Sequence, residues 1–122
     1  MKLSDFLIKV FENLISSLNL ESWVYLYIFF ELNLIKELGY DTNLSQNKSK
    51  NMNNNDFNKI KIDSYIYEVP NFLILKKIPD KFTNILIKKS LIFTRNVMQN
   101  KFFMPNNIIF PKSRVILENY FN

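Results

Sequence analysis

The feature that most constrains this chain is a long apolar segment that contains one carboxylate and ends at the only glycine. The segment runs from about Ser22 to Gly39, and its apolar side chains cover most of a helical wheel. A helix that is apolar nearly all round lies at the centre of its domain. Glycine directly after such a segment is the usual left-handed C-terminal cap. The sequence therefore predicts a central helix that stops at Gly39.

The carboxylate of this segment, Glu31, falls opposite a narrow polar strip formed by Asn33, Lys36 and Glu37. One interpretation is a general base in a pocket. The other is a structural buried acid that needs a cationic partner, because an unpaired buried charge is strongly destabilising. Arg114, which an apolar Val-Ile-Leu follows, is the first candidate partner. We favour the structural interpretation and expect no catalytic residue, so the chain is predicted not to be an enzyme.

The rest of the sequence predicts a mostly α-helical single domain over residues 1–122. Ser4 is a good N-cap for a helix over Asp5–Leu18. An asparagine-rich stretch at about residues 43–59 predicts a long flexible loop. The expected architecture is a small helical bundle with this loop and, on weaker signals, one short β-hairpin. The hairpin is suggested by apolar residues that alternate around a turn at residues 63–64, namely Ile60, Ile62, Tyr65 and Tyr67.

Three further helical segments are expected in the second half of the chain. A short one follows Pro70 and stops before Pro79, and a last one starts near Pro111. Between them, Asp80–Lys101 predicts a long helix with two apolar stripes. The first stripe consists of Phe82, Ile85, Leu86, Ile92, Phe93 and Val97, and the second of Ile87, Leu91, Met98 and Phe102.

Composition excludes several kinds of site. The 122 residues include no histidine, no cysteine and one glycine. Zinc ribbons, cysteine nucleophiles, Ser-His-Asp triads and glycine-rich phosphate loops are therefore excluded. The acids are scattered, so we expect no metal and no cofactor. No uncharged apolar run reaches the roughly 18 residues that a membrane helix needs, so we expect no membrane partner.

The net charge of +5 suggests an acidic partner, although an AT-rich genome would also raise the lysine content. Lys81, Lys88 and Arg95 are seven residues apart and so nearly in line on the long helix. This strip is either a solvated face or a cationic lip beside apolar grooves. In the second case, the basic strip beside apolar grooves would suit an acidic peptide that ends in hydrophobic residues. Phe102, next to Lys101, would extend such a binding patch.

Several short motifs follow one another along nearly the whole chain. They are Phe30-Glu31-Leu32, Leu38-Gly39-Tyr40, Asn43-Leu44-Ser45, the VPNFL sequence at residues 69–73, the LIFTRNVMQNKFF sequence at 91–103 and the PKSRVIL sequence at 111–117. In this order they resemble the C-terminal helical domain of the bacterial recombination mediator RecO. The resemblance implies a cytoplasmic, nucleoid-associated bacterial protein of DNA repair and homologous recombination. Its partners in the RecFOR pathway would be the acidic tail of single-stranded-DNA-binding protein, RecR, and more weakly single-stranded DNA.

The chain departs from the RecO pattern in two ways. The N-terminal OB-fold of the family, its main single-strand-binding module, would precede Met1, so we expect this sequence to be either a fragment or a truncated reading frame. The cysteine zinc site that many members carry is also missing, and the asparagine-rich loop stands in that region. We therefore expect no strong binding of DNA by this chain alone. The alternative function, in which the basic charge reflects genome composition only, is a small basic helical interaction or structural domain with no role in nucleic-acid metabolism.

Overall fold

The computed structural model describes residues 3, 5, 6, 20–50, 52–77, 79 and 83–121. They form a mostly α-helical fold with one two-stranded antiparallel hairpin, as the sequence predicts. In chain order the elements are α2 (Leu20–Glu37), the 3-10 turn η1 (Leu44–Asn47), β1 (Phe57–Ile62), β2 (Tyr65–Pro70), α3 (Asn71–Leu75), α4 (Asn84–Met98), the π-helical turn η2 (Gln99–Phe103) and α5 (Lys112–Tyr120). Of the predicted first helix, Asp5 and Phe6 are described and are helical. The rest of it, with its Ser4 cap, lies outside the described residues.

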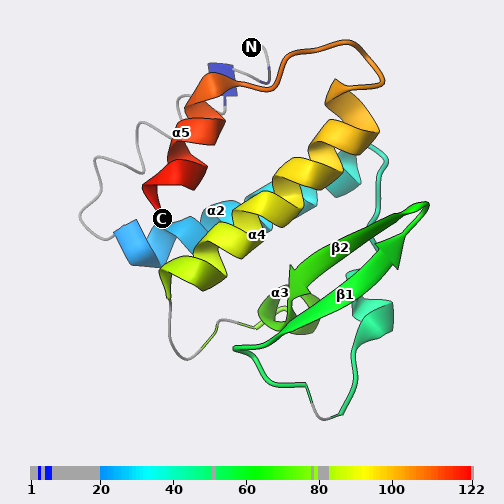
Figure 1. Cartoon of the computed structure of the whole chain (residues 1–122), viewed down its shortest axis with the longest axis vertical. Coiled ribbons are helices and arrows are strands. Elements are labelled where there is room, and N and C mark those ends of the chain that lie inside the picture. Colours follow the sequence, from blue (N-terminus) through cyan, green and yellow to red (C-terminus); the bar gives the residue numbers. More distant parts are fainter. Residues whose placement is uncertain are drawn as a thin grey trace.

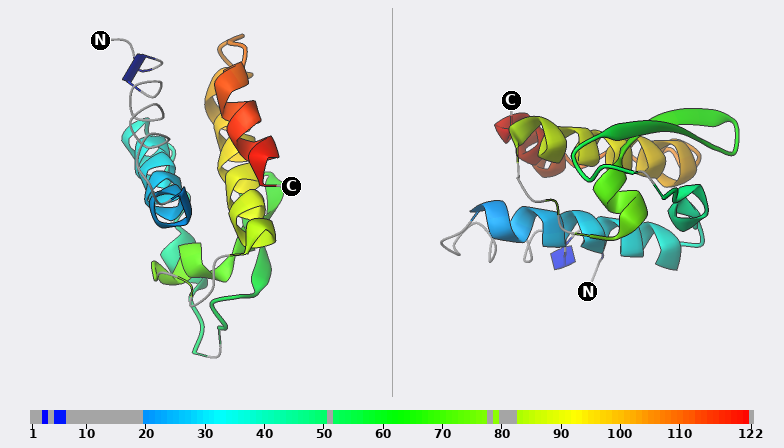
Figure 2. Two further views of the ribbon diagram at one scale, coloured as in Figure 1. Left: turned by 90° about the vertical axis from the view of Figure 1, so that its left-hand side faces the viewer. Right: turned by 90° about the horizontal axis from the view of Figure 1, so that it is seen from below.

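The elements lie in two layers (Figures 1 and 2). One layer is α2, and the other is α4 with α5 and the hairpin beside it. The hydrophobic core lies between the layers and includes Ile28 of α2, Phe72 of α3, and Leu91 and Phe93 of α4, all almost completely buried. Each such side chain stabilises the fold by about 1.5–3 kcal/mol. The central helix is thus α4 rather than α2, which the sequence predicted to be central, because α2 lies on one face of α4 while the hairpin and α5 lie along its sides.

The end of α2 has the geometry that the sequence predicts. Gly39 has a φ of 91°, which is costly for any residue with a Cβ. Its backbone N–H donates to the carbonyl of Lys36 at 2.9 Å, and the N–H of Tyr40 donates to the carbonyl of Ile35 at 3.0 Å. These two bonds form a Schellman motif, which satisfies carbonyls that the helix itself leaves free.

The predicted hairpin is confirmed. Ile62 pairs with Tyr65 across a two-residue turn, and Asp63 in that turn has a φ of 55°. Asp adopts this left-handed conformation more readily than most residues, so the turn forms without glycine. The face that carries Ile60 and Tyr67 is buried against the core.

Ion pairs join the hairpin to α4 at both ends of their contact. Lys89 Nζ lies 2.9 Å from Glu68 Oε2, and Lys101 pairs with Asp63. Lys89 and Lys101 are about 18 Å apart along a helix, and Asp63 and Glu68 about 17 Å apart along a strand. Because these lengths match, β2 runs antiparallel to α4 along most of the helix. Between the two ion pairs, Tyr67 packs edge-on against Phe93.

The asparagine-rich segment is more regular than the predicted flexible loop. Its first part contains η1, and β1 begins at Phe57, inside the range assigned to the loop. Asn71, buried at the start of α3, donates its side-chain amide to the carbonyl of Asn53 at 2.8 Å and accepts from Asn58 Nδ2 at 2.6 Å. Its backbone N–H donates to the carbonyl of Asp56. The hydrogen bonds of Asn71 therefore join this segment to the hairpin and to α3.

The predicted bounds of two helices are wrong. Thr83 is the N-cap of α4, with its Oγ1 accepting from the N–H of Leu86 at 3.2 Å, so α4 begins after the predicted Asp80. The helix also widens into η2 before the predicted end at Lys101. The short helix α3 stops at Leu75 rather than at Pro79, because Lys76 adopts the left-handed conformation there.

Two apolar residues that the sequence placed among buried neighbours are exposed. Leu26 of α2 and Ile85 of α4 are each 60% exposed. Leu26 lies in line with Asn33, so the exposed strip of α2 is wider than predicted. On α4, the fully buried positions include Ser90 and Thr94 instead. Helical spacing explains their burial, because Thr94 lies seven residues and Ser90 three residues after the buried Ile87, and both hydroxyls donate hydrogen bonds inside the core.

Replacing Gly39 with alanine tests the cap. We expect Gly39→Ala to lower the free energy of unfolding by about 1 kcal/mol, because alanine resists a positive φ. A Cβ at this position meets nothing within 4 Å, so the loss comes from the backbone conformation and not from a clash. Urea unfolding followed by circular dichroism measures it. Gly39→Asn is the control and loses less, because asparagine tolerates this conformation. Equal stability of the alanine variant and the parent chain contradicts the assignment.

Candidate functional site

The carboxylate of Glu31 is the centre of a buried polar network between three helices. Glu31 is 2% exposed and points from α2 toward α4 and α5. Tyr27, one turn earlier on α2, donates its hydroxyl to Oε2 at 2.8 Å. Thr94 of α4 donates its hydroxyl to Oε1 at 2.6 Å. These neutral donors meet the acid from its own helix and from the facing layer.

Arg114 of α5 supplies the balancing charge, which confirms the predicted pairing of a buried acid. Its Nε lies 2.6 Å from Glu31 Oε2 and its Nη2 lies 2.9 Å from Oε1, so the pair is bidentate. The same Nη2 donates to the Leu91 carbonyl at 2.9 Å and contacts Thr94 Oγ1 at 3.1 Å. The guanidinium therefore binds both α2 and α4 from its place on α5.

A second acid completes the network. Glu118, one turn after Arg114 on α5, has its Oε2 3.6 Å from Arg114 Nη1. The same oxygen lies 2.9 Å from Nε of Arg95 on α4. The network thus contains two carboxylates and two guanidinium groups, and its charges cancel. Such cancellation is what allows Glu31, Arg114 and Glu118 to be buried together.

The pKa values of two network groups show the effect of this environment. Burial raises the pKa of Tyr27 well above its ordinary value, and the neighbouring Glu31 carboxylate adds to the rise. Burial alone would lower the pKa of Arg114, but the attraction and hydrogen bonds of Glu31, together with Tyr27 and Glu118, outweigh burial, so the pKa is raised. Tyr27 therefore stays a neutral hydrogen-bond donor, and Arg114 stays a cation.

The geometry gives Glu31 a structural role. An ionised carboxylate offers about four lone-pair positions, and four donor contacts from Tyr27, Thr94 and Arg114 surround this one. A general base needs a free lone pair within reach of a substrate proton. Glu31 has neither the free position nor the exposure.

The predicted basic strip does not form one continuous site. Lys81 lies outside the described residues. Arg95 is partly exposed, but its guanidinium is held by Glu118. Lys88 is partly exposed as well, and within the described ranges no ion pair involves it. Of the two described members of the strip, only Lys88 presents a charge that the fold does not balance.

The predicted patch at the other end of α4 is tied to neighbouring elements. Lys101 pairs with Asp63 in the hairpin turn. Phe102 is partly buried, and its ring meets Phe103 edge-on with centroids 5.2 Å apart. Phe103 in turn packs against Phe110 at 5.0 Å. Phe102 thus belongs to a cluster of aromatic side chains with Phe103 and Phe110, and this cluster is well separated along the helix from Lys88.

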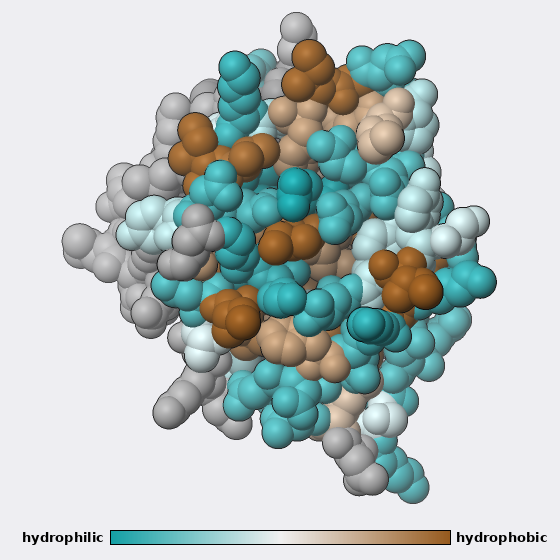
Figure 3. Space-filling view, viewed as in Figure 1, coloured by the Kyte–Doolittle hydropathy of each residue, from teal (hydrophilic) through white to brown (hydrophobic). Residues whose placement is uncertain are grey.

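Lys88 borders a shallow groove that the sequence did not indicate as a unit. The groove has a volume of about 540 Å³ and lies where the first turns of α4 meet the end of α5. Its lining residues are Asn84, Ile85, Lys88, Lys89, Ile92 and Phe121. The face of the molecule in Figure 3 presents its hydrophobic residues as separate patches among hydrophilic ones. The groove itself, as its lining residues define it, has an apolar floor and a cationic rim.

Three residues of these sites were missed by sequence reasoning. Glu118 lies one helical turn after Arg114, so its spacing was a usable signal. The spacing of Thr94 from Ile87 indicates a buried position, but it gives no signal for the bond to Glu31, because a threonine inside a helix usually bonds to its own helix. Phe121 gave none either, because its contact with α4 depends on how α5 packs.

Comparisons with known proteins add no identification. No family model, curated protein or solved structure matches the chain. The resemblance to RecO therefore stays a prediction. Within the described ranges, no three acidic residues come close enough to hold a metal ion. In the same part of the chain, no helix has the length and hydrophobicity needed to traverse a bilayer.

Removing the charge of Glu31 tests the network. We expect Glu31→Gln to lower the free energy of unfolding by about 3 kcal/mol, because it leaves Arg114 buried beside a neutral amide. Urea unfolding and the melting temperature measure the loss. Glu37→Gln on the exposed strip of the same helix is the control, with an expected change within about 0.5 kcal/mol. An unchanged melting temperature in Glu31→Gln is incompatible with this role.

Proposed function

We infer that the chain is a non-enzymatic interaction module of the RecO type. In this proposal it docks an acidic peptide that ends in hydrophobic residues, such as the tail of single-stranded-DNA-binding protein. The observation that carries the proposal is the groove between α4 and α5. Its floor is apolar, Lys88 stands on its rim, and its lining contains no acid.

The chemistry of the groove suits such a tail. Ile85 is 60% exposed on its floor, so a hydrophobic side chain docked there removes apolar surface from water. About 540 Å³ falls within the usual range of ligand sites and exceeds the volume of one large side chain. Lys88 is free to attract the acidic residues that precede the hydrophobic end. Lys89 is less available, because Glu68 holds its ammonium group.

The net charge of +5 supports steering of an acidic partner toward this groove. As a RecO-like module, the chain would act in the bacterial cytoplasm with RecR in DNA repair and recombination. Single-stranded DNA is the weaker partner in this proposal. Arg95 and Lys101 are held by internal acids, so two of the cations predicted to contact a partner are less available for phosphates.

The same internal pairing favours a second candidate function. A small basic domain in which both arginines and some of the lysines stabilise its own fold would need no nucleic-acid partner. In that case the groove would bind no acidic tail, and the lysine content would reflect genome composition. Binding measurements separate the two functions directly.

A titration with a labelled acidic peptide that ends in two or three hydrophobic residues tests the proposal. We expect saturable binding that weakens with added salt. Lys88→Glu should weaken it about ten-fold, because one attraction becomes a repulsion worth roughly 1.4 kcal/mol. Ile85→Asn should weaken it by a similar factor through loss of apolar contact. Fluorescence anisotropy measures both.

Matched controls use exposed residues outside the groove. Lys50→Glu makes the same charge change in the loop, and Ile116→Asn makes the same polar change on α5, where Ile116 is 67% exposed. Both should bind the peptide as the parent chain does. A parallel titration with a single-stranded oligonucleotide measures whether the chain also binds single-stranded DNA. Binding of neither peptide nor DNA rejects the RecO-type function and favours the structural domain.

A further inference from the structure

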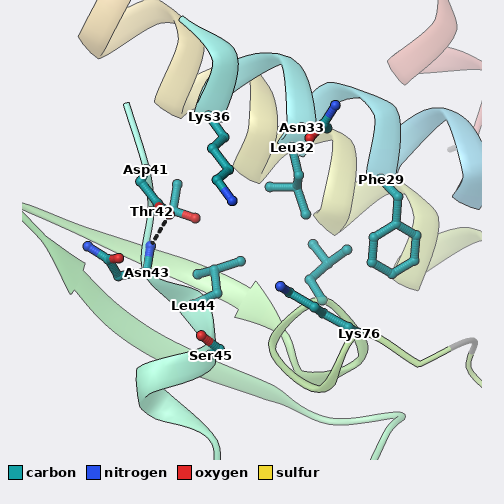
Figure 4. Close-up of a pocket in the computed structure, with 11 residues that line it drawn as sticks. Phe29, Leu32, Asn33, Lys36, Asp41, Thr42, Asn43, Leu44, Ser45 and Lys76 are labelled. Carbon is teal, nitrogen blue, oxygen red and sulfur yellow. Dashed lines mark hydrogen bonds between the residues drawn. The ribbon is translucent and has the colours of Figure 1, made fainter. Parts of the chain in front are cut away.

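A second cavity lies on another part of the molecule, between the end of α2, the segment that follows it, and α3. Its volume is about 290 Å³. Figure 4 shows its apolar wall, which comes from three separate elements. Phe29 and Leu32 belong to α2, Leu44 to η1 and Leu73 to α3. Because Leu44 and Leu73 are themselves buried core residues, the inner wall of the cavity is fixed by the packing of the fold.

Two lysine side chains reach over this apolar wall from different helices. Lys36 extends from the last turn of α2, and Lys76 from the residue that ends α3. Their ammonium groups point toward the same space, beside Leu44 (Figure 4). Within the described part of the chain, neither lysine makes an ion pair. Two cations outside any described ion pair therefore lie beside one cavity that has an apolar wall.

The lysines are not needed to complete the two helix ends. The carbonyls of Ile35 and Lys36 accept the backbone N–H groups of Tyr40 and Gly39. At the end of α3, the carbonyl of Phe72 accepts backbone N–H groups in the same way. Since backbone groups already cap both helices, the ammonium groups remain available to a ligand.

One acid limits the charge that the cavity accepts. Asp41 also lines it, and its Oδ1 accepts the backbone N–H of Asn43 at 3.0 Å (Figure 4). Asp41 with Lys36 and Lys76 leaves one net positive charge at the site. This balance suits a single negative charge better than a doubly charged phosphate.

We propose that this cavity binds a small organic monocarboxylate with a short apolar body. The carboxylate lies between Lys36 and Lys76, and the apolar body rests on Leu44 and Leu73. At about 30 Å³ for each non-hydrogen atom, a volume near 290 Å³ holds roughly ten such atoms. The site is separate from the groove of the proposed function and does not depend on it.

The probe for this site is 3-phenylpropanoate, titrated into the whole chain and followed by two-dimensional ¹H–¹⁵N NMR. We expect saturable shifts of the amide signals of Lys36, Leu44 and Lys76, with a Kd on the order of 1 mM for so small and open a site. The neutral 3-phenylpropanamide tests the need for charge, and acetate tests the need for an apolar body. Inorganic phosphate tests the limit set by Asp41. Each of the three should bind at least about three-fold more weakly.

Variants assign the contacts. Lys36→Gln and Lys76→Gln should each weaken 3-phenylpropanoate about three-fold, and the double variant about ten-fold. Lys77→Gln is the matched control, because Lys77 is an exposed neighbour that does not line the cavity. It should bind as the parent chain does.

Several results overturn the proposal. They are the lack of saturable shifts at 20-fold the expected Kd of about 1 mM, equal binding of the neutral amide, and equal effects of Lys77→Gln and Lys76→Gln. The proposal is also tested apart from the tail groove. Lys36→Gln should bind the acidic peptide normally, and Lys88→Glu should bind 3-phenylpropanoate normally. If the chain does not bind the acidic peptide, its binding of 3-phenylpropanoate can still be measured, and the reverse is also true.

Discussion

The pairing of Glu31 with Arg114 is the interaction on which the arrangement of the helices depends. It joins α2 to α5 across the side of α4, and Thr94 of α4 contacts both charged groups. Burying two charges costs free energy that a hydrophobic pair would not cost, so the gain is one of specificity rather than of stability. A bidentate pair with four further hydrogen bonds has one satisfactory geometry. It therefore fixes the register of three helices that apolar packing alone would leave free to slide.

This network lies on one side of α4, and the other sides of the helix contact the hairpin or remain at the surface. The hairpin lies along α4, held at its two ends by Lys89 with Glu68 and by Lys101 with Asp63. Exposed pairs of this kind contribute little stability each. Their effect is to orient the hairpin while Tyr67 and Phe93 supply the buried contact. What remains of α4 is the strip at its start, where Ile85 and Lys88 face the end of α5 and form the groove.

Features that depend on neighbouring residues could be predicted from the sequence, whereas most contacts between distant segments could not. Gly39 and the hairpin turn are local, and both were predicted. Glu31 stood out as a lone acid in an apolar helix, and its long-range partner could be named because an apolar Val-Ile-Leu follows Arg114. The partner of Arg95 could not be named, since Glu118 is one of many acids and meets it only after α4 and α5 pack. Lys36 and Lys76 are forty residues apart with no shared pattern, so their common cavity follows from the fold alone.

The network also determines which charged side chains remain at the surface to bind a ligand. Both arginines and two of the eleven acids cancel one another at the interface of the helices, so lysines alone carry the net charge of +5. An arginine grips a carboxylate or phosphate through a planar fork, whereas a lysine acts as a mobile, strongly hydrated point charge. The ligands proposed for this chain would therefore be selected by the apolar shape beside each lysine more than by hydrogen-bond geometry. The groove at Lys88 and the cavity at Lys36 and Lys76 share that design, and binding at both should weaken steeply as salt is added.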